Sequence, residues 1–504
     1  MRVGLLNPEA DPEAVASGAE PDPPLLQDLG LDLLLDAMGG SDPAIRAAAR
    51  RVLLAAPHAG LETVRYRLPL VEDALRNPGV VGTLYEVACL GAGTHTRGAA
   101  GFRDPDRLER LRHALAILQD QLGVLARIRE VADREAHRFR ASGWRAFFAL
   151  VQREFSAEYL ASARAELTAL AGQTGEIGST ASAGLGTGNR GTELVLRRPS
   201  PPAGFLARLG LPAGRARGIT IRLDEGDEEG ARALRALRAG ALAPTAAAAE
   251  VAAEEIGAWF LTLRDELGFH CGAVNLYHRL SGLGARIAMP QPQPPGAGRF
   301  HGTGLYDVAL ALRLGRPPVA NAFDAGGRGL ILVTGANQGG KSSFLRAIGQ
   351  AQLMMQAGMF VGAATFEAEL CRGLQTHAAR EEDPMLRHGR LDDELRRFSD
   401  IVDRLRPGAL LLLNESFAAT TERDGSQLAL QAVTALREHG VRVVFVTHLY
   451  GFARTMTSGR ARDTLCLRAE RRPDGTRTYR LRPGEPTATS HGQDVYREVF
   501  PEGA

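Results

Sequence analysis

One glycine-rich segment of the chain has the residue types and the spacing of a phosphate-binding loop. Residues 335–342 read Gly-Ala-Asn-Gln-Gly-Gly-Lys-Ser and match the pattern G-x-x-x-x-G-K-[ST] without a mismatch. Glycines let backbone N–H groups converge on an anion, an ammonium can bridge the β- and γ-phosphates, and a serine hydroxyl can ligate Mg²⁺. We therefore expect ATP and Mg²⁺ to bind here. The expected ATP-binding residues are Gly335, Ala336, Asn337, Gln338, Gly339, Gly340, Lys341, Ser342 and Ser343.

The surroundings of this loop favour the same chemistry. The apolar, β-branched run at 330–334 predicts a buried strand before it, and the residues from 342 onward predict a helix after it. The free amides and the dipole at the start of such a helix attract phosphate. The chain has 60 lysine and arginine residues, and Lys341 is the single lysine among them. The loop therefore uses an ammonium where every other basic position uses a guanidinium.

A second apolar run predicts the strand that completes such a site. Residues 409–413 are Ala-Leu-Leu-Leu-Leu, and Asn414 and Glu415 follow them. P-loop ATPases usually have Asp-Glu at this point, where the glutamate orients the attacking water. Asn414 removes one negative charge near Mg²⁺, so we expect weaker Mg²⁺ binding and slow turnover. The expected metal contacts, partly through water, are Ser342, Asn414 and Glu415.

A third predicted strand, at 441–446, ends in Thr447 and His448. A histidine in this position can reach a γ-phosphate as a sensor. A structural role is the common alternative for an isolated histidine, but the two preceding motifs favour the sensor. The expected catalytic residues are Lys341, Glu415 and His448.

Hydrophobic periodicity predicts a multidomain protein, with a mainly α-helical region followed by an α/β domain. A leucine seam at helical spacing, favouring a packed helix over a dimerising coiled coil, comprises Leu108, Leu111, Leu115, Leu118, Leu122 and Leu125. The expected parts are an extended N-terminal segment 1–40, a helical core region 41–170, a Gly- and Pro-rich connector 171–224 with short strands at 193–196 and 219–223, two antiparallel helices within 225–288, a linker 289–304 and an α/β P-loop ATPase domain 305–504.

Composition and charge exclude some classes of protein but do not identify a ligand. The net charge is +2, so nucleic acid is neither required nor excluded. No apolar run is long enough to span a bilayer, and the early acidic residues do not resemble a secretory signal. The four cysteines are far apart, which argues against a zinc site or a disulfide framework and favours a reducing cytoplasm.

Four segments together resemble the MutS family. They are TGANQGGKSSFLRAIGQ at 334–350, NESFAATTERDG at 414–425, Val-Thr-His at 446–448 and Ser-His-Gly at 490–492. The resemblance is specific over about 305–500. The helical region before it is similar in order to the MutS core and lever helices, and the 225–288 helices correspond to the lever.

The resemblance implies an ABC-type ATPase that forms a homodimer with two composite ATP sites. It further implies binding to duplex or branched DNA with little sequence preference, in mismatch repair or recombination, with ATP gating a clamp. The chain resembles a shortened form, without room for an N-terminal mismatch-recognition domain. The segment expected to reach the partner's site, 389–394, has Leu391 and Asp392 instead of the usual Ser-Thr pair, and its acidic residues are typical of a helix N-terminus.

Two alternatives to a DNA-acting ATPase remain open from the sequence. The first is a nucleotide-dependent dimeric scaffold or switch that binds a protein partner and not DNA, which the change at Asn414 and the altered 389–394 segment permit. The second is a transporter-type ATPase, which the MutS-like 414–425 segment disfavours.

Overall fold

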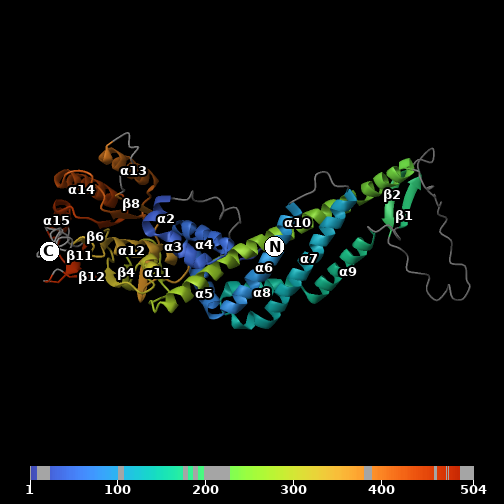
Figure 1. Cartoon of the computed structure of the whole chain (residues 1–504), viewed down its shortest axis with the longest axis horizontal. Helices are drawn as coiled ribbons and strands as arrows, with labels where there is room; N and C mark the ends of the chain where they lie inside the picture. Colours follow the sequence, from blue (N-terminus) through green and yellow to red (C-terminus); the bar gives the residue numbers. More distant parts are fainter. Residues whose placement is uncertain are drawn as a thin grey trace, which may run out of the picture. The chain divides into compact units, whose positions relative to one another are not determined.

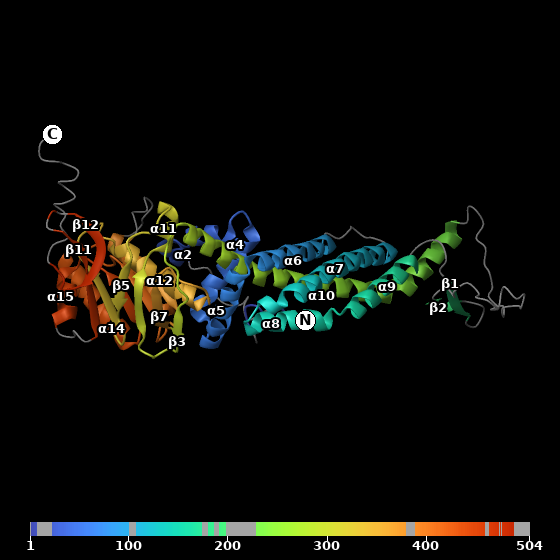
Figure 2. The same ribbon diagram turned by 90° about the horizontal axis from the view of Figure 1, so that it is seen from below.

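The computed structural model describes residues 2–7, 23–99, 107–173, 180–185, 191–197, 228–379, 389–458, 463–472, 474 and 476–487. The chain divides into two compact units. The first comprises residues 1–3, 82–138 and 145–264, and the second comprises residues 4–81, 139–144 and 265–504. Figures 1 and 2 draw the elements of both units. The predicted order, a mainly helical part followed by a mixed α/β part, is confirmed.

The first unit is built from long helices. Those that contribute to it are α6 Pro78–Ala99, α7 Arg107–Glu135, α8 Ser142–Glu154, α9 Ala157–Gln173 and α10 Glu228–Gly282. In both views α7, α9 and α10 run side by side (Figures 1 and 2). None of the helices in the described ranges combines the length and the apolar character that a bilayer-spanning helix needs.

The leucine seam of α7 is buried, as the spacing predicts. Its buried members are Leu111, Leu115, Leu118, Leu122 and Leu125. The first three cluster with small residues of α10, namely Ala246, Ala249 and Ala253. The same three-and-four spacing on both helices lets a leucine ridge pack against an alanine face. The seam therefore stabilises a helix pair within one chain.

The prediction of two helices joined by a turn within 225–288 is wrong. Helix α10 runs continuously over 55 residues and includes Pro244. A proline inside a helix removes one hydrogen bond and costs about 3 kcal/mol. Pro244 lies on an exposed face, while the alanines that follow it are packed against α7. Tertiary packing along α10 thus outweighs the local break.

A short antiparallel pair lies between α9 and α10 in the sequence. Strand β1 is Thr180–Leu185 and strand β2 is Gly191–Arg197. β2 includes the predicted strand 193–196, whereas the predicted strand 219–223 lies outside the described residues.

The second unit holds two sheets and the helices around them. Its helices are α2 Pro23–Leu29, α3 Leu31–Gly39, α4 Pro43–Ala55, α5 Leu61–Arg76, α11 Val308–Leu314, α12 Lys341–Gln356, α13 Arg390–Arg404, α14 Glu422–Glu438 and α15 Tyr450–Ser458. Its strands are β3 Gln291–Gln293, β4 Phe300–Leu305, β5 Asn321–Asp324, β6 Leu330–Thr334, β7 Thr365–Glu369, β8 Leu374–Ala378, β9 Leu410–Asn414, β10 Arg442–Val446, β11 Thr464–Arg471 and β12 Arg477–Pro483.

The extended N-terminal segment expected at 1–40 is wrong for residues 23–39, which form α2 and α3. Their leucines enter the main core of the second unit, among them Leu29, Leu34 and Leu35. Burial of an apolar face against the α/β layers supplies the stability that a short helix lacks by itself.

The larger sheet has six strands in the order β12-β11-β6-β10-β9-β8, and only β12 is antiparallel to its neighbour. Side chains alternate between its two faces. Ile331 and Val333 belong to the core that contains α12, whereas Leu330 and Leu332 belong to the core that contains residues of α13, α14 and α15. The sheet is therefore covered by helices on both sides, as continuous apolar strands predict.

The smaller sheet has the order β3-β7-β4-β5. Strand β3 lies inside the segment 289–304, so the interpretation of that segment as a simple linker is wrong. Pro292 cannot donate to a neighbouring strand, and β3 accordingly lies at the edge of the sheet, paired in parallel with β7.

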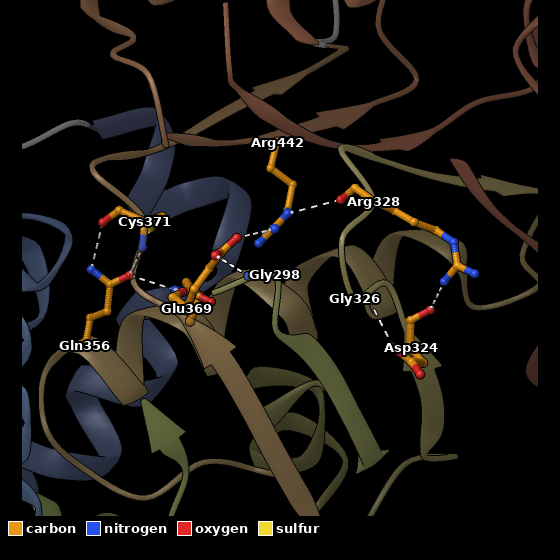
Figure 3. Close-up of polar contacts among 9 residues, drawn as sticks. Gly298, Asp324, Gly326, Arg328, Gln356, Glu369, Cys371 and Arg442 are labelled. Atoms are coloured by element: carbon orange, nitrogen blue, oxygen red, sulfur yellow. Dashed lines mark hydrogen bonds and ion pairs between the residues drawn. The ribbon is translucent and has the colours of Figure 1, made fainter. Parts of the chain in front are cut away.

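An ion pair joins the two sheets at the amino end of β10. Arg442 begins β10, and its guanidinium pairs with the carboxylate of Glu369 at the end of β7 (Figure 3). Glu369 also accepts from the N–H of Gly298 at 3.1 Å, and Arg442 donates to the carbonyl of Arg328 at 3.4 Å. The Arg442 guanidinium lies 4.8 Å from the centre of the Phe300 ring. These contacts lie at the sheet edge opposite the glycine-rich loop.

The N-terminal residues 4–7 are held in a buried polar site formed by α5 and α10. Glu266 accepts from the N–H groups of Leu5 at 2.5 Å and Leu6 at 3.1 Å. Nε2 of His270 donates to the carbonyl of Leu5 at 3.1 Å, and Arg67 donates to the carbonyl of Leu6 at 2.8 Å. Burial raises the pKa of Glu266 to about 7 and lowers the pKa of His270 to about 4.

These two shifts act in opposite directions on stability. Glu266 favours the folded state at low pH, and this contribution is lost as the pH rises from 4.5 to about 7. His270 favours the folded state above its unfolded pKa of 6.5, and this contribution is lost as the pH falls to about 4.

We predict that Glu266→Gln removes the first contribution alone. The free energy of unfolding of the variant, relative to wild type, should rise by roughly 3 kcal/mol between pH 4.5 and 7. Denaturant titrations across this range measure the difference. Glu62→Gln, which changes an exposed glutamate of α5, is the matched control and should follow the wild-type profile. A constant difference between Glu266→Gln and wild type would contradict the prediction.

Candidate nucleotide-binding site

The glycine-rich loop lies between β6 and α12, as predicted. β6 ends at Thr334 and α12 begins at Lys341. The loop turns through left-handed conformations at Gly335, Gln338 and Gly340, with φ of 107°, 57° and 88°. At Gly339 a Cβ atom would lie 2.8 Å from the Ala336 carbonyl oxygen. Glycine is therefore a steric requirement at 335, 339 and 340, whereas Gln338 adopts a left-handed conformation that is uncommon for its type.

Lys341 points back into the loop that precedes it. Its Nζ donates to the carbonyl oxygens of Gly335 at 3.0 Å and Ala336 at 3.1 Å, and to Oδ1 of Asn337 at 3.4 Å. The side chain is buried, and burial lowers its pKa, whereas the nearby carboxylate of Glu415 raises it. The loop thus concentrates one positive charge beside the free amides at the start of α12.

A hydrogen bond connects the loop to the end of β9. Ser342 Oγ donates to Oδ1 of Asn414 at 3.0 Å. The contact follows from sheet order, because β10 lies between β6 and β9 and its Val446 is in register with both Val333 and Asn414. The structure therefore brings together two oxygen atoms that the sequence assigned to Mg²⁺.

The residues after β9 have an unusual backbone. Glu415 and Phe417 have φ of 55° and 64°, which is uncommon for residues other than glycine. The Glu415 N–H donates to the carbonyl of Val446 at 2.8 Å. Ser416 Oγ donates to the carbonyl of His377 at 3.1 Å, so His377 Nδ1, 2.6 Å from the same Oγ, must be the donor to it.

His448 follows β10, as predicted, and its side chain is exposed. The preceding residue is fixed, because the Thr447 N–H donates to the carbonyl of Val333 at 3.1 Å. The His448 side chain makes no hydrogen bond with the described part of the chain. Among the expected catalytic residues, only Lys341 makes side-chain hydrogen bonds with the loop in the described part of the chain.

A cavity of about 440 Å³ lies beside the glycine-rich loop. Gly340, Ser343 and Phe344 form the side nearest the loop. The remaining lining includes Leu310, Leu314, Arg316, Pro317, Pro318, Val319, Asn321 and Tyr479. Val319 is 43% exposed and Tyr479 is 49% exposed. Apolar and aromatic surfaces next to an anion-binding loop suit a flat heterocycle attached to phosphates.

Two family models match most of the chain. The MutS2 N-terminal domain matches residues 59–283, and MutS domain V matches residues 331–501. The chain belongs to the MutS family. The segments of MutS resemblance at 334–350, 414–425 and 446–448 meet at the carboxyl ends of β6, β9 and β10. The fourth, at 490–492, lies outside the described residues.

Curated relatives carry the same family name. The DNA mismatch repair protein MSH3 of Coccidioides immitis is 31% identical over 210 residues, which are 38% of this chain and 19% of that protein. The DNA mismatch repair protein MutS of Synechococcus elongatus is 30% identical over 159 residues, 29% of this chain and 18% of that protein. The MutS of Thermus thermophilus is 30% identical over 152 residues, 29% of this chain and 19% of that protein. The match spans less than a fifth of each relative's length.

Two residues near the site of this MutS-family chain, Tyr479 and Glu394, are not among those that the sequence motifs indicate. Tyr479 comes from β12, and only the fold brings it beside Gly340. Glu394 was interpreted as part of an acidic helix N-terminus. This interpretation is wrong for Glu394, which is 4% exposed and accepts from the Phe417 N–H at 2.6 Å. It holds for Asp392, which is exposed and pairs with Arg396. Helical spacing is the signal that could have separated them, because Glu394 shares a face with Phe398 and Ile401, which pack into the core, whereas Asp392 does not.

Proposed function

We propose that this chain binds ATP with Mg²⁺ and hydrolyses ATP. One observation carries the proposal: the hydrogen bond between Ser342 and Asn414 sets the glycine-rich loop against the β9 end that carries Glu415. The MutS-family membership supports ATPase activity at the level of the family. The proposal is also supported by the proximity of Lys341 and Glu415, because the Glu415 carboxylate raises the pKa of Lys341.

The residues present fit a magnesium-bound triphosphate. Ser342 Oγ and Asn414 Oδ1 converge at 3.0 Å, and both are oxygen ligands of the type that Mg²⁺ accepts directly or through water. When bound, Mg²⁺ would neutralise negative charge on the phosphates. Lys341 would exchange its contacts with the loop carbonyls for phosphate oxygens. Glu415 would orient the attacking water, and the exposed His448 would contact the γ-phosphate.

The cavity beside the loop would hold the adenine. Tyr479 and Val319 expose apolar surface on the side where a base would leave the phosphates. Every base can stack on an aromatic ring. We therefore expect this cavity to contribute to the affinity for a nucleotide and to discriminate little between adenine and other bases.

The test of the ATPase proposal is ATP binding and hydrolysis by the purified chain. Lys341→Ala should weaken ATP binding by at least about 10-fold, because a buried ammonium is lost from the phosphate site. Glu415→Gln should retain ATP binding but lower kcat by about 10²-fold or more, since water is no longer oriented by a carboxylate. Calorimetry and phosphate release provide the measurements. Absence of ATP binding by the wild-type chain would remove the proposal.

We further predict that Asn414→Asp strengthens Mg²⁺ binding. The substitution introduces a negative charge on the side chain that accepts the hydrogen bond from Ser342. The Mg²⁺ concentration for half-maximal ATPase activity should fall by roughly 3- to 10-fold, or kcat should rise by a similar factor. Mg²⁺ titrations of both proteins decide this. Unchanged values of both would count against Asn414 as a metal contact.

We also propose that the chain acts on DNA as a homodimer, with ATP gating a clamp formed by core and lever helices. The support is membership of the MutS family and the similarity to DNA mismatch repair proteins. The alternative is a nucleotide-dependent dimeric scaffold that binds a protein and not DNA. Asn414 favours this alternative to the extent that a missing carboxylate slows turnover.

Gel-shift titrations discriminate between these two functions. Linear, mismatched and branched duplexes should each bind the chain, with affinities that fall steeply as salt rises and that change with ATP. The scaffold alternative predicts that the chain dimerises in solution when ATP is added and that it retards no duplex in the gel, even at low salt. Dimerisation without DNA binding would therefore replace the clamp by the scaffold.

A further inference from the structure

The loop that carries Glu415 is held by groups from four surrounding elements. On β10, the Val446 carbonyl accepts a hydrogen bond from the Glu415 N–H. On β8, the His377 ring is hydrogen-bonded to the Ser416 hydroxyl. On α14, Gly425 lies so close to the Phe417 carbonyl that a Cβ would come within 2.5 Å of it. The fourth element is α13. Two left-handed residues in three positions are not a conformation that the loop sequence itself favours.

The contact from α13 is made by a buried carboxyl group. Glu394 Oε1 accepts the Phe417 N–H at 2.6 Å inside the protein. The same helix also presents Phe398, whose ring lies 5.0 Å from the ring of Phe417 in an edge-on arrangement. Phe417 is therefore held by its backbone and by its side chain to one helix.

We propose that Glu394 is a positioning residue for Glu415. By accepting the Phe417 N–H, it fixes the left-handed turn two residues beyond Glu415 and so aims the Glu415 carboxylate at the nucleotide site. The inference rests on the proposed ATPase function. It assigns to α13 a role in catalysis within the same chain, in addition to any role of the 389–394 segment toward a partner.

The chain offers a graded set of variants. Glu394→Ala removes the acceptor, so kcat for ATP should fall by about 10- to 100-fold while the ATP dissociation constant stays within about 2-fold of wild type. Glu394→Gln keeps an oxygen acceptor without the charge and should recover most of the lost kcat. Asp403→Ala, which removes an exposed carboxylate of α13, is the matched control and should leave kcat unchanged.

Hydrogen exchange supplies a readout that does not require turnover. In Glu394→Ala the Phe417 amide should exchange at least about 10-fold faster, while amides 339–342 of the glycine-rich loop keep their wild-type rates. If the wild-type chain hydrolyses no ATP, the ATPase proposal fails, and faster exchange confined to Phe417 still supports the contact.

Two results would overturn the proposal. The first is unchanged kcat in Glu394→Ala while wild type is active. The second is a parallel loss of kcat, ATP affinity and melting temperature that Glu394→Gln does not recover, because that pattern belongs to a residue that only maintains the fold.

Discussion

The hydrogen bond from Ser342 to Asn414 is the contact on which the arrangement of this site depends. It exists because β6, β10 and β9 are parallel neighbours whose carboxyl ends reach the same sheet edge. A shift of one residue in the register of β9 would turn Asn414 to the other face of the sheet. The apolar cores on both faces of the sheet specify that register. The packing that fixes the register of β9 therefore also fixes the position of Asn414 at the site.

Backbone strain is concentrated on the residues nearest the proposed chemistry. Gln338, Glu415 and Phe417 all have positive φ, and all lie in the two loops that face each other across the site. Such conformations persist only where the surroundings determine them. Here the surroundings are the ends of β8 and β10 and the helices α13 and α14, so the orientation of Glu415 is a property of the whole second unit.

The strands of the site could be predicted from sequence because local and long-range requirements agree there. The runs at 330–334, 409–413 and 441–446 are mainly apolar and are followed by polar motifs, and each forms a strand at the expected position. The predictions fail where distant packing overrides a local signal. Pro244 breaks no helix because α7 stabilises α10, and the hydrogen bond from the Phe417 N–H to Glu394 exists only because the fold brings α13 beside the loop after β9.

The single lysine shows how narrow the glycine-rich loop is. Fifty or more basic positions elsewhere in the chain are arginine, yet the loop holds an ammonium among two carbonyl oxygens and an amide oxygen within 3.4 Å. A guanidinium is planar and wider, and it donates in fixed directions. It could not satisfy three acceptors that surround one point. The shape of the loop, set by glycines whose Cβ atoms would meet Ala336 or Ala469, therefore selects lysine at position 341 independently of charge.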